Sequence, residues 1–103
     1  MDIKDLQQDV TDLLKQKGFG TGDFWKKTAL VHTEVSELAD VVKKQGFENK
    51  EAIADEVADI IIRTMNYGAM FDIDIDKAVA GKMAENWGRG YQYNTIEGGG
   101  ADN

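Results

Sequence analysis

Hydrophobic residues recur at helical spacing in four segments of the chain, and no segment shows the strict alternation of a half-buried strand. The first segment begins after Asp2, carries apolar residues from Ile3 to Leu14 and stops at Gly18. The other three run from Phe24 to about Gln45, from Asn49 to about Phe71, and from Ile75 to about Trp87. Residues suited to cap the four helices precede them: Asp2, Asp23, Asn49 and Asp74. The pattern predicts an all-α protein of four helices, the second of which is closed by Gly46.

The segment from Asn49 to Phe71 is apolar on almost every side of a helical wheel, so we expect it to be buried nearly all round. One narrow stripe is polar, and it consists of Asp55, Glu56, Asp59, Arg63 and Asn66. Because burying an unpaired charge costs several kcal/mol, this stripe must line water, meet cations or hold a metal ion.

The second segment also carries acids on its apolar side. Glu34 lies inside an apolar arc and Glu37, three residues later, lies at the edge of that arc. Glu56 and Asp59 repeat the three-residue spacing on the third segment. Helices packed through these faces would bring four carboxylates together. Carboxylate oxygens suit Mg²⁺ or Mn²⁺, whose charge offsets the repulsion among the acids. A solvated acidic face is the simpler interpretation for any one glutamate, but two pairs that both intrude on apolar arcs favour a metal site.

The fourth segment adds cations and an amide. Lys82, Asn86 and Arg89 fall on one side of the helix, together with apolar residues of its first turns, so we expect them to face inward. Lysine, arginine and asparagine together are suited to phosphate oxygens. The alternative is that Lys82 and Arg89 only complement the C-terminal end of the helix.

The composition of the chain limits the kinds of site and partner that it can have. The chain has 103 residues, a net charge of −7 and no cysteine, so it has no disulfide or thiolate metal site, and its acidity argues against nucleic acid as a partner. It shows neither a basic and apolar leader nor a membrane-spanning run, which indicates a cytoplasmic protein without a membrane partner.

Residues 1–90 are expected to form one domain, and the glycine-rich residues 91–103 are expected to be a flexible tail. A short chain with so apolar a third segment predicts a homo-oligomer, a dimer or a tetramer.

Three stretches, TEVSELAD, DEVADIII and KMAENWGRGY, together resemble the MazG-like all-α nucleoside triphosphate pyrophosphohydrolases. That family has the order ExxE, spacer, ExxD and a downstream Lys/Asn/Arg cluster, and the resemblance covers roughly residues 24–91. It implies a short, single-domain MazG-like fold that assembles into a helical-bundle oligomer. It further implies Mg²⁺-dependent hydrolysis of a (deoxy)nucleoside triphosphate to the monophosphate and pyrophosphate, as in nucleotide-pool house-cleaning.

The resemblance also implies which residues form the site. The acids implied to bind metal and act in catalysis are Glu34, Glu37, Glu56 and Asp59, and the implied phosphate contacts are Lys82, Asn86 and Arg89. The preferred base is not fixed by the resemblance, and the GFGTG loop has no family counterpart.

Three other side chains have open interpretations. Trp25 could stack on a base, although an aromatic at this spacing is more often a core or dimer contact. Arg63 lies one turn after Asp59, which predicts an ion pair between them, but it could instead reach a phosphate. His32 falls on the outer face and is expected at the surface.

Two other classes of protein remain as alternatives. A carboxylate-bridged dinuclear metal protein would require Glu-x-x-His pairs, which the chain lacks. A non-catalytic helical interaction module would explain the apolar faces but not the inward-facing cations of the fourth segment.

Overall fold

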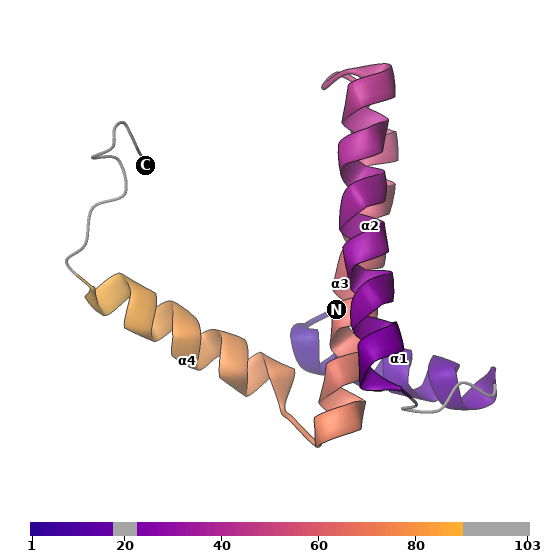
Figure 1. Ribbon diagram of the computed structural model, residues 1–103. Coiled ribbons are helices and arrows are strands. Elements are labelled where there is room, and N and C mark those ends of the chain that lie inside the picture. Colours follow the sequence, from indigo (N-terminus) through magenta and orange to yellow (C-terminus); the bar gives the residue numbers. More distant parts are fainter. Residues whose placement is uncertain (18–22, 90–103) are drawn as a thin grey trace.

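The computed structural model describes residues 1–17 and 23–89, and within these ranges the regular structure is entirely α-helical (Figure 1). The helices are α1 (Ile3–Gln16), α2 (Phe24–Gln45), α3 (Lys50–Phe71) and α4 (Ile75–Gly88). The prediction of an all-α protein with four helical segments is therefore confirmed for this part of the chain. The glycine stop at Gly18, the rest of the GFGTG loop and the tail at residues 91–103 lie outside the described residues.

Each described helix begins directly after the residue predicted to cap it. The side chains of Asp2, Asp23, Asn49 and Asp74 each accept a hydrogen bond from a backbone N–H of the first turn. These bonds satisfy N–H groups that have no partner within the helix. Gly46 ends α2 with a φ of 81°, a conformation that glycine adopts without a steric cost, as predicted from its position.

Helices α2 and α3 form an antiparallel hairpin and lie side by side along most of their length (Figure 1). Near the open end of this hairpin, the hydroxyls of Thr28 and Tyr67 are 2.7 Å apart and share a hydrogen bond. The Phe24 ring packs against the rings of Tyr67 and Phe71, with centroids 5.9 Å and 5.8 Å away. The hairpin places the acids of α2 opposite those of α3.

Helix α1 contacts α3 and the start of α4 through Gln7 and Gly68. The Gln7 carboxamide donates to the Ile73 carbonyl at 2.8 Å and accepts from the Ile75 N–H at 3.0 Å, so one side chain bonds to the α3–α4 turn and to the first residue of α4. A Cβ atom at position 68 would come within 2.8 Å of Gln7 Cδ. Glycine at this position therefore allows α1 to approach α3 closely.

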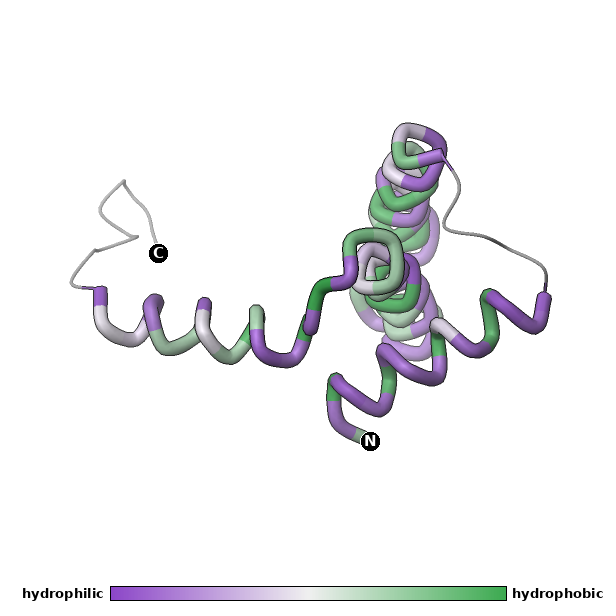
Figure 2. The backbone as a smooth tube through the Cα atoms, turned by 90° about the horizontal axis from the view of Figure 1, so that it is seen from below, coloured by the Kyte–Doolittle hydropathy of each residue, from purple (hydrophilic) through white to green (hydrophobic). Residues whose placement is uncertain are grey.

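Helix α4 leads away from the hairpin, as Figures 1 and 2 both show. Every residue from Lys77 to Arg89 is exposed, including the large apolar side chains of Val79, Met83 and Trp87. The expectation that α4 turns a face with Lys82 inward is therefore wrong for the single chain. Helical periodicity identifies the face but not the direction in which the α3–α4 turn sends the helix.

The single chain has a small core. Among the described residues, Val10 and Met65 are the buried apolar side chains. Val57, Ile61 and Ile62 of α3 remain about two-fifths exposed, at 39%, 43% and 40%. The expectation that this helix is buried nearly all round is wrong for one chain, because α1 and α2 cover only part of its surface. None of the described helices is long and apolar enough to cross a bilayer.

Candidate metal and phosphate site

Three of the four predicted acids come together between α2 and α3. Glu34, Glu56 and Asp59 each offer a carboxylate oxygen, and these oxygens all lie within 4.8 Å of one another. We refer to these three residues as the acidic cluster. Its members come from facing turns of the antiparallel hairpin, which is why the repeated three-residue spacing converges on one place.

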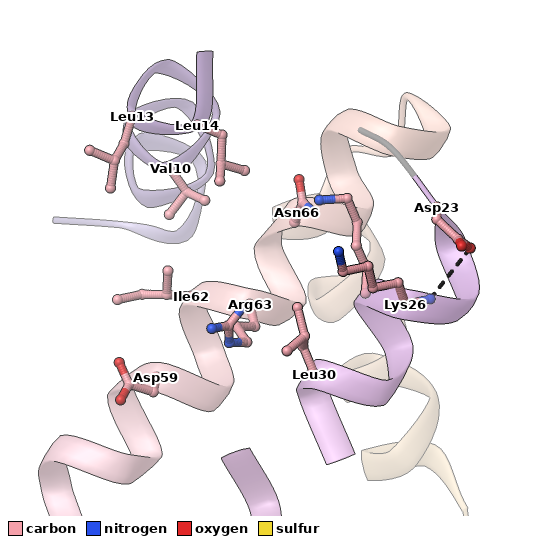
Figure 3. Close-up of a pocket in the computed structure, with 11 residues that line it drawn as sticks. Val10, Leu13, Leu14, Asp23, Lys26, Leu30, Asp59, Ile62, Arg63 and Asn66 are labelled. Carbon is pink, nitrogen blue, oxygen red and sulfur yellow. Dashed lines mark hydrogen bonds between the residues drawn. The ribbon is translucent and has the colours of Figure 1, made fainter. Parts of the chain in front are cut away.

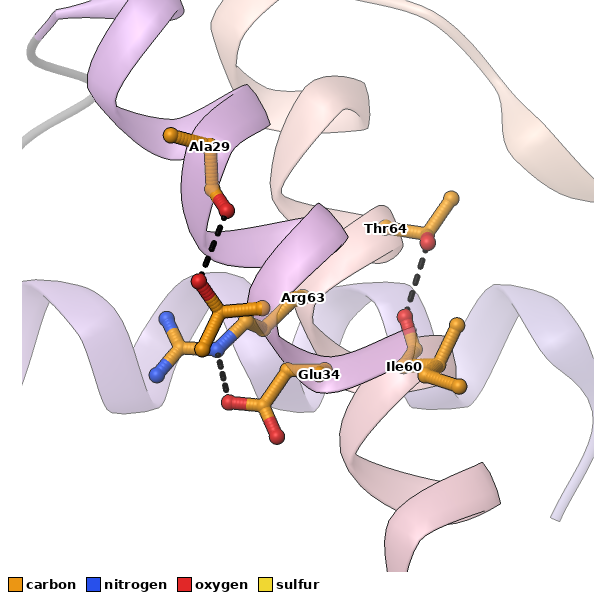
Figure 4. A network of polar contacts seen from close by, with 6 residues as sticks. Ala29, Glu34, Ile60, Arg63 and Thr64 are labelled. Carbon is orange, nitrogen blue, oxygen red and sulfur yellow. Dashed lines mark hydrogen bonds and ion pairs between the residues drawn. The ribbon is translucent and has the colours of Figure 1, made fainter. Parts of the chain in front are cut away.

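Glu34 is the buried member of the acidic cluster, with 8% of its surface exposed. Its Oε2 atom accepts a hydrogen bond from Arg63 Nε at 2.8 Å, a contact that joins α2 to α3 (Figure 4). The predicted pair of Arg63 with Asp59 on the same helix is replaced by this contact across the hairpin. The physical reason is that the buried Glu34 carboxylate needs a countercharge more than the exposed Asp59 does.

Two oxygen atoms of the acidic cluster have no hydrogen-bond partner among the described residues. They are Oε1 of Glu34 and Oε1 of Glu56, and both atoms are buried. Leaving a buried carboxylate oxygen unpaired is costly, so this part of the structure provides acceptors for a group from outside the chain. A hard cation satisfies such oxygens.

Mutual repulsion and partial burial raise the pKa values of two acids here. Burial of the Glu56 carboxyl raises its pKa, and the charges of Glu37, Asp59 and Glu34 raise it further. The charge of Glu34 is the main cause that raises the pKa of Glu37, with partial burial and the charge of Asp59 adding to the effect. The ionised acids therefore oppose one another, and a bound cation would relieve the repulsion.

Glu37 itself lies at the edge of the acidic cluster. It is exposed and its oxygens are not among those within 4.8 Å, yet its pKa responds to both Glu34 and Asp59. The four predicted acids thus divide into three that converge and one that remains beside them.

A cavity of about 630 Å³ adjoins the acidic cluster (Figure 3). Asp59 and Arg63 are among its lining residues, and the others come from α1, the start of α2 and the C-terminal half of α3. The volume lies in the range of small-molecule sites. Periodicity could not predict this cavity, because it depends on how α1 crosses the hairpin. The sequence does signal Lys26 and Lys27, which line it, as adjacent cations at a helix start.

The predicted phosphate-binding residues are not brought to the acidic cluster within one chain. Lys82 Nζ lies 3.0 Å from Glu85 Oε1, and Arg89 Nη2 lies 2.7 Å from the same oxygen. Asn86 is exposed on the same helix, which leads away from α2 and α3 (Figure 1). Glu85, as the partner of two cations, was missed by the sequence analysis, although its spacing of three and four residues signals the contacts.

Trp25 and His32 both lie at the surface. Trp25 is 76% exposed, packs edge-on against Phe24 with centroids 4.9 Å apart, and is not among the residues that line the cavity. The prediction that His32 faces solvent is confirmed. His32 does not belong to the acidic cluster.

Comparison of the chain with protein-family models, with curated proteins and with solved structures gives no match. Function is therefore argued from the acidic cluster and the cavity.

Proposed function

We propose that this protein is a Mg²⁺-dependent nucleoside triphosphate pyrophosphohydrolase, which converts a (deoxy)nucleoside triphosphate and water to the monophosphate and pyrophosphate. The observation that carries the proposal is the convergence of Glu34, Glu56 and Asp59, two of which have buried oxygens without a partner. The order of motifs along the chain, which resembles that of the MazG-like enzymes, gives the reaction class.

The donor set fits Mg²⁺. Three carboxylates supply the hard oxygen ligands that this cation prefers, and no softer ligand competes for it in the acidic cluster. Because one carboxylate oxygen from each of Glu34, Glu56 and Asp59 lies within 4.8 Å of the other two, these residues would hold a hard divalent cation between them. Arg63 occupies Oε2 of Glu34 and leaves Oε1 of that carboxylate for the cation.

The reaction requires an attacking water in line with the phosphorus–oxygen bond between the α- and β-phosphates. When bound, Mg²⁺ supplies charge neutralisation on the triphosphate and makes its coordinated water more acidic. We assign Glu37 to orient the attacking water and accept its proton, because this carboxylate adjoins the acidic cluster without belonging to it and has a raised pKa. The new phosphorus–oxygen bond forms as the anhydride bond breaks, and pyrophosphate leaves.

Two groups of residues are candidates for contacts with the phosphates. Within one chain, Arg63 is the cation beside the acidic cluster, and Lys26 and Lys27 line the same cavity farther along α3. Lys82, Asn86 and Arg89 keep their proposed phosphate role only if a second copy of the chain brings its α4 to the hairpin, since α4 of the same chain leads away. A homo-oligomer is therefore part of the proposal.

The proposal is tested by incubating the purified protein with a panel of canonical and modified nucleoside triphosphates and Mg²⁺, and by assaying pyrophosphate. We expect pyrophosphate release for at least one nucleotide and its loss in excess EDTA. Release of inorganic phosphate instead, or no product from any nucleotide, would contradict the proposal.

A non-catalytic helical interaction module is the second candidate, and α4 is the observation that favours it. Its exposed Val79, Met83 and Trp87 recur every four residues and form an apolar stripe without cover in the single chain. The same assay separates the candidates, because an interaction module binds partners through this stripe and releases no pyrophosphate from any nucleotide.

A further inference from the structure

The cavity beside the acidic cluster has one apolar side and one polar side. Helix α1 contributes Val10, Leu13 and Leu14, and the hairpin adds Leu30 and Ile62. Figure 3 shows these side chains around the cavity, with α1 on one side and the start of α2 on the other. Such a surface suits the faces of an aromatic ring, which gain from burial against aliphatic groups.

Asn66 is the polar group that the fold leaves unsatisfied in this cavity. Its side chain belongs to a residue only 9% exposed, it lines the cavity, and its Oδ1 atom is buried without a hydrogen-bond partner among the described residues. A buried amide oxygen without a partner costs free energy that a ligand can recover by donating a hydrogen bond to it. The carboxamide carries both a donor and an acceptor, so it pairs with a group that presents an acceptor and a donor side by side. The polar edge of a nucleobase has this arrangement.

Two lysines of α2 add positive charge to the same cavity. Lys26 and Lys27 line it, and neither forms an ion pair with any described residue. Asp23, the nearest acid in sequence, instead accepts hydrogen bonds from the backbone N–H groups of Trp25 and Lys26. The two ammonium groups are therefore available to an anionic ligand in the cavity.

The polar groups are ordered along α3. Asp59 is shared by the cavity and the acidic cluster, and Asn66 follows it by seven residues, which corresponds to about 10 Å along the helix axis. That separation matches the length of a nucleoside placed with its phosphate at Asp59 and its base at Asn66. Lys26 and Lys27 lie at the Asn66 end of the cavity, because Thr28, the next residue of α2, shares a hydrogen bond with Tyr67.

We propose that this cavity binds the base and sugar of the nucleotide, that the Asn66 carboxamide selects the base by hydrogen bonding to its polar edge, and that the positive charges of Lys26 and Lys27 strengthen binding of the anionic nucleotide. The assignment rests on the proposed function, because the acidic cluster fixes which end of the ligand carries the phosphates. It makes Asn66 a specificity-determining residue that does not take part in the hydrolytic step.

Binding is measured by calorimetric titration with the four α,β-imido deoxynucleoside triphosphates, which resist cleavage at the α–β link, in the presence of Mg²⁺. We expect the wild type to prefer one base. Asn66→Leu keeps the size of the side chain but removes the amide, and should weaken binding of the preferred base about tenfold while the four affinities converge. Thermal melting of each variant shows whether it remains folded.

Two matched pairs of variants test the cavity independently of Asn66. Ile62→Trp fills the cavity and should abolish binding of all four analogues, whereas Ile61→Trp changes an equally exposed neighbour that does not line it and should bind as the wild type does. Lys26→Ala should weaken all four analogues by a similar factor, about tenfold or more. Lys43→Ala, near the other end of α2, should change none of them.

The outcomes separate the two proposals. An unchanged base preference in Asn66→Leu, or wild-type binding by Ile62→Trp, overturns the cavity assignment, as does a wild type that binds none of the analogues. If Asn66→Leu does not fold, the Ile62→Trp result decides. Binding that depends on Asn66 without pyrophosphate release from ordinary nucleotides contradicts the hydrolase proposal alone. Pyrophosphate release that all of these variants retain, with wild-type base preference, contradicts the cavity assignment alone.

Discussion

The contact between Arg63 and Glu34 gives a prediction that couples stability to metal binding. Glu34 is buried, and Arg63 Nε at 2.8 Å is the cation that compensates its charge across the α2–α3 hairpin. Arg63→Met keeps much of the aliphatic stem and removes the charge. In EDTA this leaves a carboxylate in a buried position beside two other acids, with no countercharge in contact.

The size of the effect follows from the geometry. A charge-assisted hydrogen bond contributes about 1.5–3 kcal/mol, and the value is reduced here because the Arg63 side chain is 42% exposed and partly screened by solvent. We therefore expect a loss of about 1–2 kcal/mol in the free energy of unfolding, or roughly 5–15 °C in melting temperature for a domain of this size. Saturating Mg²⁺ should recover most of this loss, because the cation replaces the countercharge and stabilises the folded state by binding to it.

The assay is thermal unfolding of wild type and variant in EDTA and in Mg²⁺, at one fixed protein concentration. Lys44→Met is the matched control, because Lys44 forms an exposed pair with Asp40 at 2.9 Å and should lose little stability in either buffer. An Arg63→Met protein as stable as the wild type in EDTA, or one whose deficit is the same with and without Mg²⁺, would refute the reasoning.

Four further predictions follow from the same structure. Glu56→Gln should melt at the same or a higher temperature than the wild type in EDTA, because it removes one of several clustered charges; a marked loss of stability would show that Glu56 has a structural partner. The pKa values of Glu37 and Glu56 are raised by folding, so their contribution to stability is present below the ordinary value of 4.5 and is lost as the pH rises through the raised values. The melting temperature in EDTA should therefore fall more steeply with pH in the wild type than in the Glu37→Gln, Glu56→Gln double variant, and parallel curves would count against this. Lys82→Ala should lower kcat/KM by about ten- to a hundredfold with little change in melting temperature, and a large loss of stability with kcat/KM preserved would assign Lys82 a structural role with Glu85. Light scattering at micromolar concentration should show at least a dimer, because so much apolar surface of α3 and α4 is uncovered in one chain; a monomer would refute the predicted assembly.

Local signals in the sequence were sufficient to predict where the helices begin. Asp2, Asp23, Asn49 and Asp74 were identified as caps because capping depends on residues within one turn. The acidic cluster was also predictable, because two acid pairs on consecutive helices can face each other when a short turn makes the helices antiparallel. In both cases the relevant neighbours are close in sequence or fixed by one short connection.

Contacts between distant segments could not be predicted in the same way. A helical wheel offers Arg63 only partners on its own helix, so it indicated Asp59 and missed Glu34 on α2. Asn66 was placed on the polar stripe of α3, but its lack of a partner is visible only once α1 and α2 surround it. The direction of α4 depends on the turn that Gln7 holds, and helical periodicity contains no information about that turn.

The claim that the acidic cluster drives cleavage of the α–β anhydride is tested most directly by ³¹P NMR of a nucleoside triphosphate incubated with Mg²⁺ and each of three proteins. The proteins are wild type, Glu56→Gln, and Glu51→Gln as a control for an exposed acid of the same helix outside the acidic cluster. We predict equal amounts of nucleoside monophosphate and pyrophosphate with wild type and Glu51→Gln, and unchanged triphosphate with Glu56→Gln. Formation of nucleoside diphosphate and inorganic phosphate, no turnover by the wild type, or near-normal turnover by Glu56→Gln at saturating Mg²⁺ would contradict the account.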